Sequence, residues 1–336
     1  MTISAERCRQ ILAAAQGTRV LVVGDMVVDE HIIGHSTRLS REAPVPVIEQ
    51  RGHLFVPGGA ANPAYNARSL GSDVSVCGLV GDDEMGDRLR RILDEAGIHT
   101  AGLATEPSRP TSVKLRVWAG GAGQMHYQQV ARVDVSNREP MSEQSQQELL
   151  LYLEGAIPEY GAVIVSDYES GVVDAPILEY VLSSAERHGK QVVVDSHGGF
   201  ARFQGVTAVT PNQPEAEAEL GMSMDDDRAL ESGGNELRAR LDCTHLLITL
   251  GGNGMALFSR GQPMKRVVAH SVPGLVDATG AGDTVASAFT LSLLGNADPV
   301  EAAEIANAAG AAVVSRLGAS TTRPEEVAAM FEAAGD

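Results

Sequence analysis

Short apolar runs that alternate with helical segments dominate the second half of the chain. Four of them, GAVIVSDY, QVVVDSH, VTAVTPNQ and HLLITLGG, follow one another between residues 161 and 252. Short runs rich in β-branched residues are typical of strands buried on both faces, and their alternation with helices predicts a parallel sheet covered on both sides. The chain is therefore expected to fold as an α/β protein.

The first half follows the same pattern with two interruptions. RVLVVGD and DVSVCGLVGDD read as strands, and NPAYNARSLGS and EMGDRLRRILDEAGI read as helices that end near a glycine. The stretches at about 30–57 and 111–135 instead alternate, and the first carries three prolines, so neither fits a central sheet. We expect them to form one small sheet standing off a single domain that spans residues 1–336.

Charge and cysteine content narrow the classes of protein. The net charge of −18 and the absence of a basic run argue against a nucleic-acid partner and against anionic membrane surfaces. Three scattered cysteines, Cys8, Cys77 and Cys243, fit buried thiols in a reducing cytoplasm, and no apolar run approaches the length of a membrane span. We expect a cytoplasmic protein whose anionic ligands are held by local groups.

Polar residues follow several of the predicted strands. Ligands of open α/β sheets bind beyond the carboxyl ends of the strands. An aspartate after a strand is more often a turn or helix cap than a catalytic group, but here many such residues are expected to converge on one rim. They are Asp25, Asp29, Asp167, Asp195, Asn212 and Thr249.

A glycine-rich loop, VDATGAGDTVASAF, precedes the last long predicted helix. It matches neither a GxxxxGK[ST] phosphate loop nor a GxGxxG dinucleotide fingerprint. Asp283 could simply cap the helix. Alternatively, the amides beside Gly280, Ala281 and Gly282 form an anion hole at the helix N-terminus, and Asp283 accepts the proton of a substrate hydroxyl.

Together with PGGAANPAYNARSLG, this loop resembles the two signature stretches of the ribokinase-like (PfkB) sugar kinase family. The resemblance extends from about Arg19 to Thr322. It implies a three-layer α/β/α sandwich with a mostly parallel sheet and a small β-sheet lid, built from about 30–57 and 111–135. It further implies ATP and Mg²⁺ as cofactors, and a homodimer formed through the lid.

The resemblance also implies roles for individual residues. Asp283 would be the catalytic base, with Gly280, Ala281 and Gly282 lining the anion hole. The sugar-binding positions would be Asp25, Asp29, Gly58, Gly59, Asn62, Arg116 and Asp195. The nucleotide-binding positions would be Asn212, Glu215, Thr249, Gly251, Gly254, Asn307 and Gly310. Glu215 would help to arrange Mg²⁺ through water, and Asp277 and Thr279 would bind a monovalent cation such as K⁺.

STRLSREAPVPVIE, KLRV and SDY are most similar to the kinases that phosphorylate D-glycero-β-D-manno-heptose 7-phosphate at its anomeric hydroxyl. Two positions depart from that pattern, because Ser170 and His197 stand where those kinases usually have lysine. A substrate phosphate needs cations nearby, and losing two lysines weakens the case for one. Candidates to replace them are Arg38, Arg41, Lys114, Arg116 and Arg132.

The sequence therefore predicts an ATP-dependent sugar kinase, and the retained SREAPVP stretch favours the anomeric hydroxyl of D-glycero-β-D-manno-heptose 7-phosphate as the acceptor. Alternatives stay open. One is a kinase of the same family acting on an unphosphorylated sugar or nucleoside. Another is a sugar- or nucleotide-binding protein without catalysis, which the joint presence of base, anion loop and NxxE pattern disfavours. A dinucleotide-dependent oxidoreductase ranks below both, because its fingerprint is absent.

Overall fold

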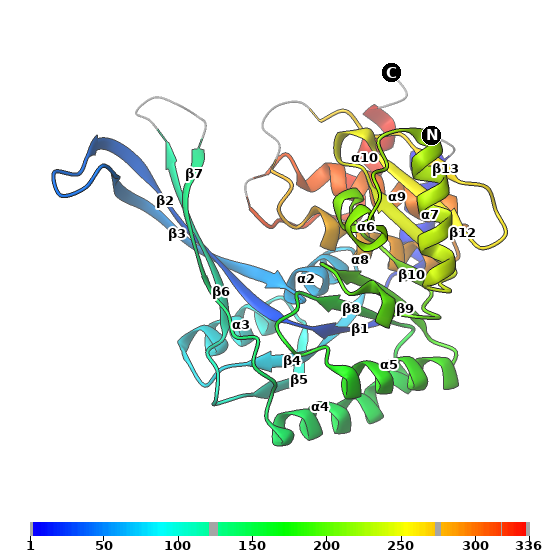
Figure 1. Ribbon diagram of the computed structural model, residues 1–336, viewed down its shortest axis with the longest axis horizontal. Coiled ribbons are helices and arrows are strands. Elements are labelled where there is room, and N and C mark those ends of the chain that lie inside the picture. The colour runs from blue at the N-terminus through cyan, green and yellow to red at the C-terminus, as the bar shows by residue number, and fades with distance from the viewer. Residues whose placement is uncertain (1–2, 121–126, 273–276, 317, 334–336) are drawn as a thin grey trace.

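A nine-stranded sheet forms the centre of the molecule (Figure 1). The computed structural model describes residues 3–120, 127–272, 277–316 and 318–333. Seven neighbouring strands, from β11 to β5, are parallel to one another. At the other edge of the sheet, β12 pairs antiparallel with both of its neighbours, β11 and β13. In spatial order the strands are β13 (Lys265–Val267), β12 (Met255–Ser259), β11 (His245–Thr249), β10 (Ala208–Val209), β9 (Gln191–Ser196), β8 (Ala162–Asp167), β1 (Arg19–Gly24), β4 (Asp73–Val80) and β5 (His99–Thr105).

Helices cover both faces of this sheet. One face packs against α1 (Ala5–Ala14), α2 (Ala61–Ser69), α3 (Glu84–Glu95), α8 (Ala281–Leu294), α9 (Pro299–Val313) and α10 (Pro324–Ala333). The other packs against α4 (Glu143–Ala156), α5 (Ala175–Arg187), α6 (Gln213–Leu220) and α7 (Asp227–Arg240). Three short 3₁₀ turns complete the described helices: η1 (Ile157–Glu159), η2 (Phe200–Arg202) and η3 (Gly251–Asn253).

Strand β1 shows why the apolar runs are continuous. Val20 and Val22 belong to the core under one face, while Leu21 and Val23 belong to the core under the other. Successive strand side chains point to opposite faces, so a strand buried on both sides needs an apolar residue at every position. The predicted α/β fold with a sheet covered on both faces is confirmed.

A smaller four-stranded sheet extends away from this body (Figure 1). Its spatial order is β3 (Pro46–Gly59), β2 (Met26–Leu39), β6 (Ser112–Gly120) and β7 (Tyr127–Val135), with β2 and β6 parallel and both outer pairs antiparallel. These are the two stretches predicted to leave the central sheet; residues 121–126 of the second lie outside the described residues.

The small sheet is joined directly to the central one. Only Asp25 separates the end of β1 from the start of β2, and β3 runs into α2 within two residues. This connection brings the inner face of the small sheet over the carboxyl ends of the central strands. Among the described helices, none is long and apolar enough to cross a membrane.

Candidate active site

Asp283 lies in the first turn of α8 and is 4% exposed. The turn before it is made by Gly280, whose φ of 76° favours glycine and whose missing side chain leaves room for Asn62. A Cβ on Gly280 would lie 2.5 Å from the Asn62 amide nitrogen. The glycine loop therefore has a physical reason: it lets α2 approach the N-terminus of α8.

The amides of this turn carry the helix-terminal donors that an anion would use. Ala281 N–H already donates to the carbonyl of Ala278 at 3.2 Å. Of the positions expected to line an anion hole, Ala281 is thus partly engaged, and Gly282 and the following amide are the better placed. Binding of an anion there remains a prediction.

Two side chains contact the Asp283 carboxylate. Asn62 donates from Nδ2 to Oδ2 at 2.7 Å, and Tyr168 places its hydroxyl 3.3 Å from Oδ2 and 3.4 Å from Oδ1. Asn62 is held in turn by Asn66, which donates to its side-chain oxygen at 3.1 Å. Burial raises the pKa of Asp283 to about 6, although the Asn62 hydrogen bond opposes the shift. Such a carboxyl is suited to exchange a proton near neutral pH.

Asp195 supplies a second, half-buried carboxylate next to the first helical turn. A Cβ on Gly282 would lie 3.8 Å from Asp195 Oδ2, so the glycine leaves the two acids close together. Burial, and then the charge of Asp283, raise the pKa of Asp195 to about 8. Asp195 lies at this turn, where the charges of His197 and Glu215 also act on it, and its predicted sugar contact stays a prediction.

Asn212 and Glu215 begin α6. The Asn212 side chain accepts from Glu215 N–H at 2.9 Å, and Glu215 Oε2 accepts from Asn212 N–H at 2.8 Å, which is a reciprocal capping box. The other oxygen, Oε1, lies 3.0 Å from His197 Nδ1. This hydrogen bond is the largest influence on His197 and raises its pKa. The pair therefore has a structural role besides the nucleotide role expected of it.

Asp25, one of the residues predicted to bind sugar, anchors the loop after β8. Its carboxylate is buried and accepts three backbone N–H bonds, from Tyr168 (2.8 Å), Ser170 (3.0 Å) and Val172 (3.1 Å). Both oxygens thus accept hydrogen bonds from the loop after β8, and the predicted sugar contact stays a prediction. Gly59 packs against this position, because a Cβ there would lie 2.3 Å from the Asp25 carbonyl oxygen.

Asp29 and Arg116 form a buried ion pair on the inner face of the small sheet. Arg116 Nη1 lies 2.6 Å from Asp29 Oδ1, and their side chains are 8% and 6% exposed. Gly58, on the neighbouring strand, allows this carboxylate to lie close, since a Cβ there would meet Asp29 Cγ at 2.8 Å. The structure thus brings together three of the residues predicted to bind sugar.

The residues predicted to bind nucleotide lie at the far end of the central sheet. Gly254 lets the turn before β12 approach the end of β13, because a Cβ there would lie 2.0 Å from the Val267 carbonyl oxygen. Asn307 donates to the carbonyl of Val268 at 2.8 Å, and Gly310 packs α9 against α8. Thr249 ends β11 and Gly251 begins η3. These contacts shape the region, and nucleotide binding by these residues stays a prediction.

Asp277 and Thr279 lie in the loop before α8. Asp277 accepts from Thr279 N–H at 3.0 Å and from Gly318 N–H at 2.8 Å. Burial would raise the pKa of Asp277, but these hydrogen bonds outweigh it and lower the pKa. The carboxylate is therefore charged at neutral pH, as a cation site requires. Among the described residues, no group of three or more His, Cys, Asp or Glu side chains is arranged to hold a metal ion.

A basic cavity of about 320 Å³ opens beside these groups. Tyr168 and Ser170 form one wall, and strands β6 and β7 form another. Its basic residues are Lys114, Arg132, Arg138 and His197, and its one acidic residue is Asp134, which pairs with Arg132 at 2.8 Å. Of the arginines and lysine proposed to replace the missing lysines, Lys114 and Arg132 reach this cavity. His197, which the sequence marked as a loss, itself lines this cavity, and its raised pKa favours the charged form.

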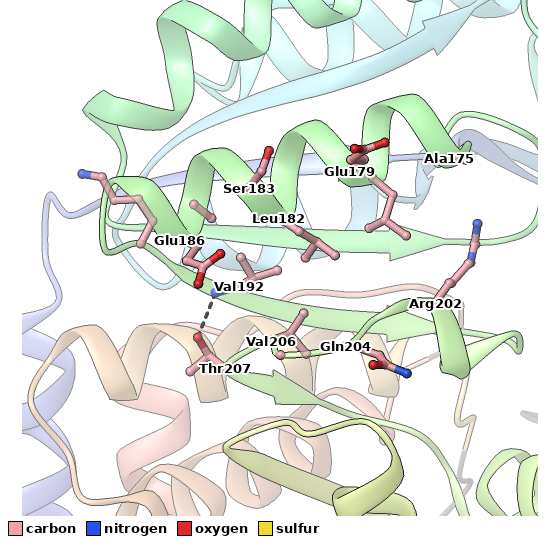
Figure 2. Close-up of a pocket in the computed structure, with 14 residues that line it drawn as sticks. Ala175, Glu179, Leu182, Ser183, Glu186, Val192, Arg202, Gln204, Val206 and Thr207 are labelled. Carbon is pink, nitrogen blue, oxygen red and sulfur yellow. Dashed lines mark hydrogen bonds between the residues drawn. The ribbon is translucent and has the colours of Figure 1, made fainter.

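A larger cavity of about 660 Å³ lies elsewhere, between α5 and the segment 202–207 (Figure 2). Figure 2 shows Leu182 and Glu186 of α5 pointing toward Val192, Val206 and Thr207. None of the candidate site residues described in the preceding paragraphs lines this larger cavity. The volume of a cavity therefore does not identify the candidate active site. The carboxylates with raised pKa values identify it instead.

Comparison with known proteins identifies the family of this chain. Residues 18–326 match the pfkB family of carbohydrate kinases. The bifunctional protein HldE of Desulfatibacillum aliphaticivorans is 37% identical over 315 residues, which cover 94% of this chain and 63% of that protein. HldE of Helicobacter pylori strain G27 is 36% identical over 92% of this chain and 65% of its own length. The chain thus spans less than two thirds of these curated relatives.

Solved structures agree on the fold. Arabidopsis thaliana ribokinase complexed with ribose and ATP superimposes with a TM-score of 0.71 at 19% identity, covering 94% of this chain and 99% of that one. Phosphofructokinase-2 from Escherichia coli in complex with potassium gives 0.75 at 18% identity, covering 96% and 100%. The family match extends over most of the chain, and the chain belongs to the pfkB family of ATP-dependent carbohydrate kinases.

Proposed function

We propose that this kinase transfers the γ-phosphate of ATP to the anomeric hydroxyl of D-glycero-β-D-manno-heptose 7-phosphate. The observation that carries the phosphorylated substrate is the basic cavity beside Asp283. In a chain of net charge −18, Lys114, Arg132, Arg138 and His197 line one cavity, and Tyr168, which also lines it, places its hydroxyl 3.3 Å from Asp283 Oδ2. Burial, the charge of Arg132 and that of Arg116 lower the pKa of Lys114, and a bound phosphate would offset that repulsion.

The catalytic roles follow from the geometry of the carboxylate. Asn62 donates to Asp283 Oδ2 at 2.7 Å, whereas Oδ1 has the longer 3.4 Å contact with the Tyr168 hydroxyl, so Oδ1 would take the proton from the acceptor hydroxyl. The amides at the start of α8 would stabilise the charge of the transferring group. Asp29 and Arg116, fixed by their ion pair, would orient the sugar from the small sheet, with Gly58 and Gly59 allowing close approach.

The carboxylates of Asp195 and Glu215, near Asp283, suit a bound Mg²⁺. Asp195 and Asp283 lie close enough for the charge of one to raise the pKa of the other, so a cation near them relieves a buried repulsion. We propose that Asp195 and Glu215 hold Mg²⁺, directly or through water. Bound there with ATP, Mg²⁺ would neutralise phosphate charge.

The remaining assignments are proposed by family membership together with position. Thr249, Gly251, Gly254, Asn307 and Gly310 would form the nucleotide site, and Asp277 and Thr279 would hold K⁺. The three cysteines, Cys8, Cys77 and Cys243, are buried and unpaired, which supports the proposed cytoplasmic location.

The direct test is an assay of ADP release with heptose 7-phosphate, other sugar phosphates, free sugars and nucleosides, each with and without potassium. We expect heptose 7-phosphate to give the highest kcat/KM. A clear preference for a free sugar or nucleoside would contradict the phosphorylated substrate, and ligand binding without ADP release would contradict catalysis.

Lys114→Met tests the basic cavity. We expect KM for the sugar phosphate to rise about 10- to 100-fold with a smaller change in kcat, since a hydrogen bond to a charged group contributes roughly 1.5–3 kcal/mol. Lys190→Met, in the cavity of Figure 2, is the matched control and should leave KM unchanged. Equal loss with phosphorylated and free sugars would show that Lys114 does not bind the phosphate.

We also propose that the small sheet pairs with that of a second copy to form a homodimer. Six of the eight large apolar side chains exposed on the described surface belong to this sheet or its β2–β3 connection: Leu39, Val45, Leu54, Val130, Val133 and Val135. Exposed apolar groups gathered on one element mark an interaction surface. Light scattering should give the mass of a dimer, and Val133→Asp should lower the fraction of dimer. A monomer at micromolar concentration would contradict the proposal.

A further inference from the structure

The phenol of Tyr168 lies against both oxygens of Asp283. Its hydroxyl donates toward Oδ2 at 3.3 Å and Oδ1 at 3.4 Å, while Asn62 holds Oδ2 at 2.7 Å. These phenol contacts are long, as catalytic hydrogen bonds often are before substrate binds. The hydroxyl of Tyr168 therefore lies where it can set the orientation of the Asp283 carboxylate.

Tyr168 is itself held on three sides. Its backbone N–H donates to Asp25 at 2.8 Å, Lys114 Nζ lies 4.1 Å from the centre of its ring, and the His197 ring meets it edge-on with centroids 4.3 Å apart. A cation over an aromatic face and a T-shaped ring contact both restrict the ring. The buried carboxylate of Asp25 thus has a purpose: it fixes the loop that aims this phenol at the base.

The phenol is also a permanent proton donor. Burial, and then the negative charge of Asp283, raise the pKa of Tyr168 well above its usual value. The hydroxyl consequently keeps its proton at any pH at which a kinase works. A donor to a carboxylate stabilises the charged form of that carboxylate, which is the form a base requires.

We propose that Tyr168 is a positioning residue for Asp283: it orients the carboxylate so that Oδ1 faces the acceptor hydroxyl, and it keeps that carboxylate ionised. This inference rests on the proposed role of Asp283 as the base. It gives the loop after β8 a part in the reaction beyond lining the basic cavity.

Several charged groups face Asp283 from the elements packed around it. Asp29 of β2 and Asp195 of β9 disfavour its charged form, while Lys114 of β6 and His197 after β9 favour it. Tyr168→Phe removes only the hydroxyl and keeps the ring that packs against Lys114 and His197. Any change in the titration of Asp283 in this variant then reports the lost hydrogen bond.

In steady-state assays with the preferred substrate, we expect Tyr168→Phe to lower kcat about tenfold and to leave KM within about twofold. The acidic limb of the kcat profile should move to higher pH by about half a unit to one unit, because the lost donor had favoured the ionised base. Titrations of the substrate and ATP are common to both enzymes and cancel in the comparison. Tyr180→Phe, on α5, is the matched control and should change neither.

A double-mutant cycle with Asp283→Asn tests the contact without any substrate. The urea midpoint shifts of Tyr168→Phe and Asp283→Asn should not add in the double variant, since the two groups touch. Additive shifts, or an unchanged kcat and acidic limb in an active enzyme, would overturn the proposal. A raised KM with normal kcat would make Tyr168 a substrate-binding group instead. A wild-type chain without kinase activity would count against the proposed function, while the cycle would still decide the contact.

Discussion

Replacing Asp283 with asparagine is expected to lower kcat by about 10²–10⁴-fold, the usual contribution of a general base. Asparagine preserves the shape of the side chain and can still receive the hydrogen bond from Asn62, but it cannot take a proton. The N-terminus of α8 keeps its amides and Gly280 keeps its turn, so the binding groups remain in place.

Binding should therefore survive this change. Calorimetry should give dissociation constants for sugar phosphate and for ATP within a few-fold of the wild-type values. Asp174→Asn, at the N-cap of α5, is the matched control, because asparagine caps a helix as well as aspartate does. Near-normal turnover of Asp283→Asn would rule out the carboxylate as the base.

Replacing Asp25 with alanine is expected to cost stability as well as activity. The change leaves the buried N–H group of Val172 and the partly buried N–H groups of Tyr168 and Ser170 without their acceptor. An unsatisfied buried donor costs about 1–3 kcal/mol and a partly exposed one less, so the free energy of unfolding should fall by about 3 kcal/mol. The freed loop would no longer aim Tyr168 at the base, and kcat should fall too.

Urea denaturation measures the first effect and steady-state kinetics the second. Asp82→Ala removes an exposed aspartate that also follows a strand, β4, and should leave both unchanged. If Asp25→Ala kept wild-type stability and raised only the KM for sugar, Asp25 would be a sugar ligand, as the sequence had suggested, and not the anchor of this loop.

The comparison of Asp25 with Asp283 shows how far sequence reasoning reached. Both aspartates were marked by their place after a strand or before a helix, and both are buried at the predicted rim. Their uses differ because hydrogen-bond partners come from distant segments. Asp25 meets N–H groups more than 140 positions away, and Asp283 meets an amide 221 positions away. Nothing in the local pattern distinguishes these outcomes.

Tyr168 and His197 are the clearest residues that the sequence undervalued. Tyr168 appeared only as part of SDY, and His197 appeared as a lost lysine. The signal that could have found Tyr168 is its position directly after a buried strand that ends in aspartate. The role of His197 depends on Glu215 and on the cavity walls, which come from other strands.

The sequence by itself determined the α/β fold, the two-sided burial of its strands, the separate small sheet and the family. These follow from periodicity and from motifs, which are local and repeat along the chain. Only the tertiary structure decided which carboxylate oxygens are free, which aspartate anchors a loop and where the basic groups meet. Those outcomes depend on distances between side chains far apart in sequence, because buried polar groups take the partners that the packed fold brings within hydrogen-bonding reach.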